Sequence, residues 1–365
     1  KILRKHNRRW LITHNGLFPN VDGRKLMGTL DFFSHDQYPL FHKTWGAQAA
    51  GLVTARSLSF PFGVMEQQSG PGGQMEYLHR TPRPNEIRLW AFQSVAHGAK
   101  LLSYFCWQTC PFGSEQHWHG LIDQDGRDTR RLAEATALRK ELQALPRDFW
   151  DAAPSRYAAV LRDYDNEAND RRINTYHKSG HWEQYRWLAE LAKAHVPCDF
   201  TWPDGDWAGY RLLIAPHLQL MDLTLAKRLT SFVRSGGTLI LGAQSGTMDR
   251  NGHVVRITPP GLLRALTGVE VEDWTTLAPD ESREATFADG QSIHLTSFAE
   301  RLRLRGANSI ARWWGDDPLL AQAPAVAQRS VGTGRVIYVG GHLGHDSIRT
   351  LTGRCLTEMT FRPVV

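Results

Sequence analysis

Among the residues of this 365-residue sequence that are able to do chemistry, two glutamates stand in unusual settings. Glu66 follows the apolar run FPFGVM and precedes the amide- and glycine-rich stretch QQSGPGG. Glu115 lies in FCWQTCPFGSEQHWHG, residues 105–120, among aromatic side chains and two histidines. A pair of carboxylates suits glycosidic bond cleavage, in which one protonates the leaving oxygen and the other attacks the anomeric carbon or activates water. The alternative for Glu66 is an acid that faces water where a buried strand reaches the surface.

The side chains around the two glutamates fit a site for sugars. A carboxylate that attacks a sugar must stay ionised among hydrogen-bond donors, which Gln67, Gln68 or Tyr38 can supply. In residues 105–120, tryptophan faces can stack on the apolar faces of sugar rings, while Glu115 and a histidine bind hydroxyls. The alternative for this stretch is an aromatic core beneath a polar loop.

Other reactive patterns in the sequence are incomplete. Cys106 and Cys110 have no second cysteine pair at metal spacing, and the H-x-H histidines beside them lack a third ligand, so we predict no metal. SVGTGR, residues 330–335, lacks the third glycine of a dinucleotide loop, and LGAQSG, residues 241–246, places Gln244 where a nucleophile elbow needs a nucleophile. We therefore expect no cofactor and a non-catalytic second half. The low number of cysteines indicates a reducing compartment, so we predict a cytoplasmic location.

Four strand-like runs come before residue 110, and each ends in a residue that can bind or react. The runs span residues 10–15, 30–39, 59–67 and 99–108. The residues at their ends that can bind or react are, in the same order, Asn15, Asp36 with Tyr38, Glu66 and Trp107. Their apolar residues fall on both faces, as in a buried parallel sheet. Helices are predicted over residues 85–98, with Ile87, Trp90, Ala91, Ser94 and Val95 on one stripe, and over 128–145. A barrel collects its site from the ends of several strands, so the pattern favours half of a barrel over a doubly wound sheet.

From residue 152 the pattern changes to an open α/β domain. Strands are predicted over residues 156–164, 210–216, 238–246 and 334–342, and helices over 181–196 and 224–237. The short loops and the alternation of strand and helix indicate a flavodoxin-like layout. Residues 257–330 are less regular, and we interpret them as a β-rich insertion.

The composition describes a globular protein, with 41% hydrophobic and 22% charged residues. No run of about 18 apolar residues occurs, so we expect no membrane association. The net charge of +6 is dispersed apart from the first ten residues, and no nucleic-acid-binding motif accompanies it, so we expect no nucleic-acid partner. The opening KILRKHNRRW has no initiating Met and resembles the last turns of a helix, which predicts a fragment or a mature form.

Four stretches together resemble glycoside hydrolase family 42, the bacterial β-galactosidases. They are DQYP, VMEQQSGPGG, RTPRPNEIRLWAFQSVAHGA and GSEQHWHGLIDQDGR, all within residues 10–145, and the later α/β domain is similar to the trimerisation domain of that family. The resemblance implies that residues 1–150 hold strands 5–8 of a (β/α)8 TIM barrel. It also implies a trimerisation domain with a flavodoxin-like or glutamine-amidotransferase-like fold over 151–350, and the start of a truncated C-terminal segment over 351–365.

The resemblance also implies release of terminal β-D-galactose with retention of configuration. It implies that Glu66 is the nucleophile, and that the substrate is held by Asn15, Tyr38, Trp107, Glu115 and His119. Glu115 is then a binding residue, and the acid/base glutamate, in an Asn-Glu pair, would lie upstream of Lys1. We therefore expect this chain to be inactive by itself. The parent protein is expected to bind a galactoside or oligosaccharide substrate and to form a homotrimer.

Two other functions stay open at this point. The chain can act instead as a non-catalytic oligomerisation or interaction module. Upstream sequence with a strand that ends in Asn-Glu would exclude this alternative. Many family members have Trp and Arg where Gln74 and Gln108 stand here. A retaining glycosidase for another sugar, such as an α-L-arabinopyranoside, is therefore the second alternative.

Overall fold

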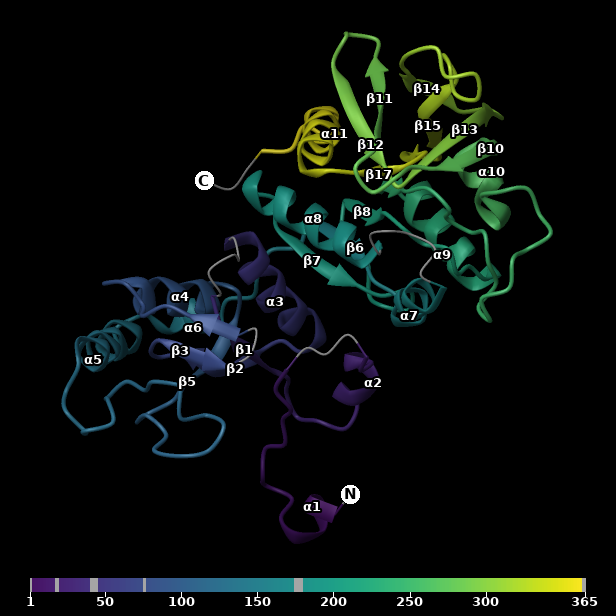
Figure 1. The fold of residues 1–365 in the computed structure, drawn as a ribbon. Helices are drawn as coiled ribbons and strands as arrows, with labels where there is room; N and C mark the ends of the chain where they lie inside the picture. Colours follow the sequence, from purple (N-terminus) through teal and green to yellow (C-terminus); the bar gives the residue numbers. More distant parts are fainter. Residues whose placement is uncertain (1, 17–19, 40–44, 75–76, 174–179, 363–365) are drawn as a thin grey trace. The chain divides into compact units, whose positions relative to one another are not determined.

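The computed structural model of the protein describes residues 2–16, 20–39, 45–74, 77–173 and 180–362 (Figure 1). Contacts between residues divide the chain into two compact units, Lys1–Ser155 and Arg156–Val365. None of the described helices combines the length and the apolar character that crossing a bilayer requires.

The first unit is built on a parallel sheet of three strands, in the order β1-β2-β5. A short hairpin of β3 and β4 follows β2. The strands are β1 (Ser34–Gln37), β2 (Phe62–Gln68), β3 (Gly72–Gln74), β4 (Tyr77–His79) and β5 (Ala99–Phe105). The helices are α1 (Ile2–His6), α2 (Gly23–Met27), α3 (Trp45–Leu58), α4 (Glu86–Ala96), α5 (Arg130–Gln143) and α6 (Arg147–Asp151).

The core of this unit lies between α3 and the sheet. Leu52 and Ala55 of α3 pack with Phe62 and Val64 of β2 and with Ala99 of β5, all almost fully buried. Burying such side chains contributes roughly 1.5–3 kcal/mol for each large one, so this cluster fixes the sheet against its helix.

Two of the helix predictions in this unit are confirmed. The buried residues of α4 are the predicted stripe, Ile87, Trp90, Ala91, Ser94 and Val95. The helix predicted over residues 128–145 is α5, whose first turn is capped by Thr129, the acceptor for the Leu132 backbone N–H at 3.2 Å. Pro146 ends the segment and is followed by α6.

Two strand predictions need correction. The first predicted strand, residues 10–15, is an extended segment that forms one parallel bridge, Asn15 with Ser34, and no strand of its own. Leu11 in this segment is 76% exposed, so its apolar residues are not buried in a sheet. β5 was expected to be buried on both faces, yet Leu101 is 42% exposed. Leu101 is exposed because, among the described residues, β5 pairs with β2 alone and is therefore an edge strand.

The second unit contains a ten-stranded mixed sheet and a separate pair, β10 with β13. The sheet order is β17-β12-β11-β14-β15-β16-β9-β8-β6-β7. The helices are α7 (Tyr164–Ile173), α8 (Gly180–Lys193), α9 (Leu223–Arg234), η1 (Gly261–Leu263), α10 (Arg264–Thr267) and α11 (His345–Glu358). The strands are β6 (Ala158–Leu161), β7 (Cys198–Thr201), β8 (Leu212–Ala215), β9 (Thr238–Leu241), β10 (Val269–Thr276), β11 (Ser282–Phe287), β12 (Ser292–Thr296), β13 (Phe298–Leu304), β14 (Asn308–Trp313), β15 (Pro324–Val331), β16 (Gly334–Val339) and β17 (His342–Leu343).

The parallel part of this sheet runs β7-β6-β8-β9-β16, with every neighbouring pair parallel. Numbered along the chain, these strands have the order 2-1-3-4-5, which is the order of flavodoxin-like sheets. Leu213 and Leu239 on one face pack against Leu229 and Val233 of α9. The alternate residues Leu212 and Ile240 are fully buried too, as a parallel sheet covered on both faces requires.

Strands β10 to β15 confirm the β-rich insertion that was predicted over residues 257–330. β11, β12, β14 and β15 continue the sheet in antiparallel pairing beside β16. Residues 330–335 form the hairpin between β15 and β16, with Val331 opposite Gly334, so SVGTGR is a turn.

α11 continues across residue 350 and packs against α8 (Figure 1), so the second unit does not end there.

The turn after β9 has the shape of an elbow. Gln244 has φ = 63°, and a Cβ on Gly242 would lie 1.7 Å from the Pro216 carbonyl oxygen, so only glycine fits there. The Gln244 backbone N–H donates to Glu300 Oε1 at 2.9 Å, and the Tyr338 hydroxyl donates to Glu300 Oε2 at 2.9 Å. Burial raises the pKa of Glu300 to about 7, although these donors oppose the change. The turn after β9 therefore donates to a fully buried carboxyl group on β13.

Candidate active site

Glu66 lies near the carboxyl end of β2, directly beside β1. Its Cα is the register partner of Asp36, and that pair follows an irregularity between His35 and Asp36. Because parallel strands end at the same edge of a sheet, the side chains at the ends of β1 and β2 converge there. This edge is where the sequence analysis expected the site.

Two hydrogen-bond donors from different segments reach the Glu66 carboxylate. The Tyr38 hydroxyl donates to Oε2 at 2.7 Å, and the Asn15 Nδ2 amide donates to Oε1 at 3.5 Å. Burial, together with the hydrogen bond to Glu66, raises the pKa of the Tyr38 phenol well above its usual value. Tyr38 therefore stays protonated and donates to the carboxylate throughout the physiological range.

A second carboxyl group, Asp36, belongs to the same cluster. The Asn15 Nδ2 amide donates to Asp36 Oδ2 at 2.8 Å, so one amide group contacts both acids. Burial raises the pKa of Asp36 to about 6, with Asn15 opposing the change and the charge of Glu66 adding to it. Asp36 was predicted to lie at a strand end but not to be a site residue. The signal was present in DQYP, where an acid stands two residues before Tyr38.

An aromatic wall stands beside this cluster. The Trp118 ring lies 5.2 Å from the ring of Tyr38 and 4.9 Å from that of His79, centroid to centroid. Phe105, at the end of β5, packs edge-on against Trp118 at 5.7 Å. Edge-to-face aromatic pairs of this kind add roughly 0.5–1.5 kcal/mol beyond burial. Sequence reasoning did not single out Trp118, although it lies in the aromatic stretch 105–120.

The glycines after Glu66 allow two stretches of backbone to pass closely. A Cβ on Gly70 would lie 2.2 Å from the His119 carbonyl oxygen, and one on Gly72 would lie 1.7 Å from that of His117. The chain is hydrogen-bonded across this contact, since the His119 N–H donates to the Pro71 carbonyl at 3.0 Å. The glycine-rich stretch therefore lets residues 117–120 lie against the segment that leaves β2.

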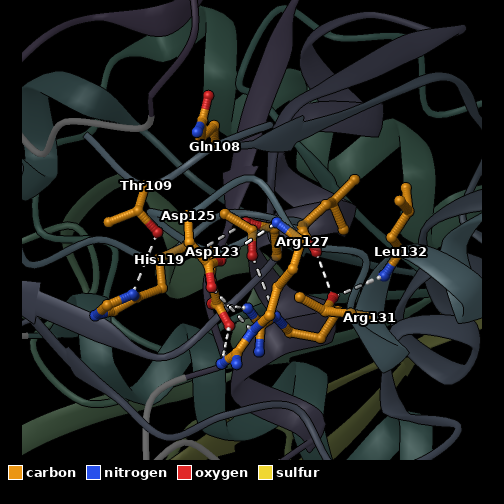
Figure 2. Close-up of polar contacts among 12 residues, drawn as sticks. Gln108, Thr109, His119, Asp123, Asp125, Arg127, Arg131 and Leu132 are labelled. Atoms are coloured by element: carbon orange, nitrogen blue, oxygen red, sulfur yellow. Dashed lines mark hydrogen bonds and ion pairs between the residues drawn. The ribbon is translucent and has the colours of Figure 1, made fainter. Parts of the chain in front are cut away.

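Contacts with the start of α5 anchor the end of the loop that carries Glu115 and His119. Asp123 pairs with Arg131 at 2.6 Å and with Arg127 at 3.2 Å, as the dashed lines in Figure 2 mark. Although burial opposes it, these two guanidinium groups hold the pKa of Asp123 below its usual value. Arg131 also donates to the Gly120 carbonyl at 3.1 Å, so the first turn of α5 is tied to the end of the loop.

The predicted site residues fall into two groups. Asn15, Tyr38 and Glu66 form one hydrogen-bonded cluster. His119 lies farther along the loop, where its Nδ1 pairs with Thr109 Oγ1 at 3.2 Å (Figure 2). The side chains of Glu115 and Trp107 are exposed, and within the described part of the chain no hydrogen bond joins either of them to Glu66.

Three other patterns named from the sequence can be placed. Cys106 and Cys110 are both free thiols of intermediate exposure, and burial raises the pKa of Cys106. Gln108 is exposed and donates to the Gln124 carbonyl at 3.5 Å. The side chain of Gln74 lies outside the part of the structure that is described.

Comparison with known families agrees with the motifs. A family model described as β-galactosidase matches residues 1–145, and one described as the β-galactosidase trimerisation domain matches residues 156–362. The chain belongs to glycoside hydrolase family 42. The resemblance noted from the sequence is therefore confirmed at the level of the family.

Individual members of family 42 show the same relationship. β-Galactosidase BgaH of Haloferax lucentense is 31% identical to this chain, over 94% of the chain and 53% of its own length. The crystal structure of a β-galactosidase from Bacillus circulans sp. alkalophilus has a TM-score of 0.92 and 25% identity, and covers 100% of this chain and 55% of its own. A β-galactosidase from Halorubrum lacusprofundi has a TM-score of 0.88 and 27% identity. The chain thus spans about half the length of the relatives it matches.

Proposed function

We propose that the whole protein to which this chain belongs hydrolyses terminal β-D-galactosides with retention of configuration, and that Glu66 is its nucleophile. The observation that carries the proposal is the 2.7 Å hydrogen bond from Tyr38 to Glu66 at the ends of adjacent parallel strands. It lies within the region that matches the β-galactosidase family. A carboxylate fixed by neighbouring donors at that edge is what a retaining glycosidase needs for attack.

In the proposed reaction, an oxygen of Glu66 forms a bond to the anomeric carbon as the bond to the leaving oxygen breaks. The transition state is oxocarbenium-like and gives a galactosyl-enzyme. A second carboxyl group, proposed to lie upstream of Lys1, protonates the leaving oxygen. It then takes a proton from the water that attacks the anomeric carbon, and the bond to Glu66 breaks to release galactose and the free carboxylate. Asn15 and Tyr38 orient Glu66 and the sugar, while Trp107, Glu115 and His119 bind the substrate from the loop after β5.

The first unit is proposed to be part of a (β/α)8 barrel. The bridged segment at Asn15 and strands β1, β2 and β5 correspond to strands 5–8. Two observations support this assignment: among the described residues β5 pairs with β2 alone, and a groove of about 590 Å³ opens beside β5. Its lining is mostly apolar and includes Leu102 and Trp107 near β5, Leu132 and Leu142 on α5, and Trp150 of α6. The rest of the barrel would cover this groove, so we expect negligible hydrolysis from this chain alone.

The second unit is proposed to hold the subunits of a homotrimer together, with a flavodoxin-like or glutamine-amidotransferase-like fold. The family match over residues 156–362 and the 2-1-3-4-5 order of its parallel strands support this proposal. Because the family match runs to residue 362, we propose that this domain extends past residue 350, where the start of a C-terminal segment was predicted. A cytoplasmic location stays a prediction from the cysteine content.

The test is the hydrolysis of a nitrophenyl β-galactoside by the whole protein and by its Glu66→Gln variant. We expect a fall in kcat of at least about 10³-fold, because the amide cannot form the glycosyl-enzyme. Glu141→Gln, on the exposed face of α5, is the matched control and should retain activity. Full activity in Glu66→Gln would overturn the assignment, and the anomer of the first product, read by proton NMR, tests retention.

The two alternatives give different outcomes in the same assay. Faster release from a nitrophenyl α-L-arabinopyranoside would favour the other sugar, the alternative suggested by Gln108 at a position where many family members have Arg. A folded whole protein that releases nitrophenol from neither substrate would favour a non-catalytic oligomerisation module.

A further inference from the structure

Asp36 lies at the centre of the cluster around Glu66. Its Oδ2 accepts the Asn15 amide at 2.8 Å, whereas the same amide lies at 3.5 Å from Glu66 Oε1. The shorter bond decides the orientation of the amide, since 2.8 Å lies within the usual range for N–H···O hydrogen bonds and 3.5 Å lies beyond it. Asn15 is thus held mainly by Asp36 and, in that orientation, directs an N–H at Glu66.

We propose that Asp36 is a positioning residue for the nucleophile, which acts on Glu66 by fixing the side-chain amide of Asn15. The inference rests on the proposed function of Glu66. It assigns no contact with substrate to Asp36, whose Oδ1 is buried and has no hydrogen-bond partner among the described residues.

The backbone contacts around Asn15 place the chain but do not orient the side-chain amide. Residues 10–15 form no strand and meet β1 through a single bridge, Asn15 with Ser34. The Ser34 N–H donates to the His14 carbonyl at 3.2 Å, and the Ser34 hydroxyl donates to the same carbonyl at 3.1 Å. These bonds place the backbone of the segment. The direction of the Asn15 amide is left to its side-chain partners, of which Asp36 is the nearer.

The charged groups that face Asp36 come from three segments. Glu66 lies on β2, His14 precedes Asn15, and Tyr38 follows Asp36 on the same chain segment. Asp36 and Glu66 are register partners on neighbouring strands, and the negative charge of Glu66 adds to the rise in the pKa of Asp36 that burial causes. The Asn15 amide lies between the two acids and donates to both, with the shorter bond to Asp36.

The first experiment compares Asp36→Ala with Asp36→Asn in the whole protein. Asn at position 36 keeps an acceptor oxygen for Asn15, whereas Ala removes it. We expect kcat to fall by about ten- to a hundredfold in Asp36→Ala with KM changed by less than about threefold, and Asp36→Asn to recover most of the loss. Equal losses in the two variants, or none in Asp36→Ala, would overturn the proposal. Asp148→Ala, an exposed aspartate on α6, is the surface control.

The second experiment needs no activity and uses this chain as it stands. In a spectrum of the ¹⁵N-labelled asparagine side chains, the Asn15 amide signal should move in Asp36→Ala and stay near its original position in Asp36→Asn. An unmoved Asn15 signal in Asp36→Ala contradicts the proposal. If the spectra behave as expected but Glu66→Gln keeps full activity, the proposed function has failed while the contact of Asp36 with Asn15 stands.

Discussion

At the scale of single residues, the hydrogen bond from Tyr38 to Glu66 is the contact on which the proposed chemistry depends most directly. A hydrogen bond to a charged group contributes roughly 1.5–3 kcal/mol, and its loss leaves the carboxylate short of a donor. We expect Tyr38→Phe in the whole protein to lower kcat/KM by about ten- to a hundredfold in steady-state kinetics. The matched control is Tyr104→Phe on β5, since the Tyr104 hydroxyl is buried without a partner among the described residues. A Tyr38→Phe variant as active as the control would speak against the role of Tyr38.

A second residue-scale prediction concerns Glu300 in the other unit. Its pKa is raised to about 7 by burial, above the usual value of 4.5. Between these values the unfolded chain is ionised while folded Glu300 keeps its proton, so its contribution to stability is full below about pH 4.5 and is lost as the pH rises through 7. Glu300→Gln removes this dependence. Urea unfolding at pH 5 and pH 8 should show the variant gaining free energy of unfolding relative to the parent at the higher pH. A constant difference would contradict the prediction.

At the scale of elements, the loop over residues 106–120 is placed by its contact with the glycines after β2. Gly72 has φ = 125°, and a Cβ there would overlap the His117 carbonyl oxygen. We expect Gly72→Ala to destabilise the first unit by at least about 1–3 kcal/mol from backbone strain alone and to displace Trp118. Thermal unfolding and tryptophan fluorescence of this chain measure both effects. Gly353→Ala is the control, because a Cβ at that position in α11 has open space around it. Unchanged fluorescence in Gly72→Ala would mean that the loop does not depend on this contact.

At the scale of the whole molecule, the second unit is expected to assemble copies of the chain. Its match to the trimerisation domain covers residues 156–362, nearly all of the unit. We predict that sedimentation equilibrium of this chain gives three times its 41.3 kDa mass at micromolar concentration. A monomer under these conditions would count against assembly through this unit.

The elements that the sequence predicted well are those whose pattern is local. The buried stripe of α4 could be read from spacing because Pro84 and Gly98 bracket a period of 3.6 residues. The apolar runs of β6, β8 and β9 could be read because strands covered on both faces are continuously hydrophobic. Residues 10–15 misled the prediction, since their pattern is strand-like but they meet a neighbour at one bridge only.

The sequence by itself determined the family, two successive α/β regions and the identity of Glu66, Tyr38 and Asn15 as candidates, because each depends on motif letters or on local periodicity. Only the tertiary structure decided that Asp36 shares the Asn15 amide with Glu66 and that Trp118 packs on Tyr38. Those contacts join segments separated by tens of residues, and their geometry follows from strand register and loop path. Neither contact can be predicted from the spacing of residues along the chain.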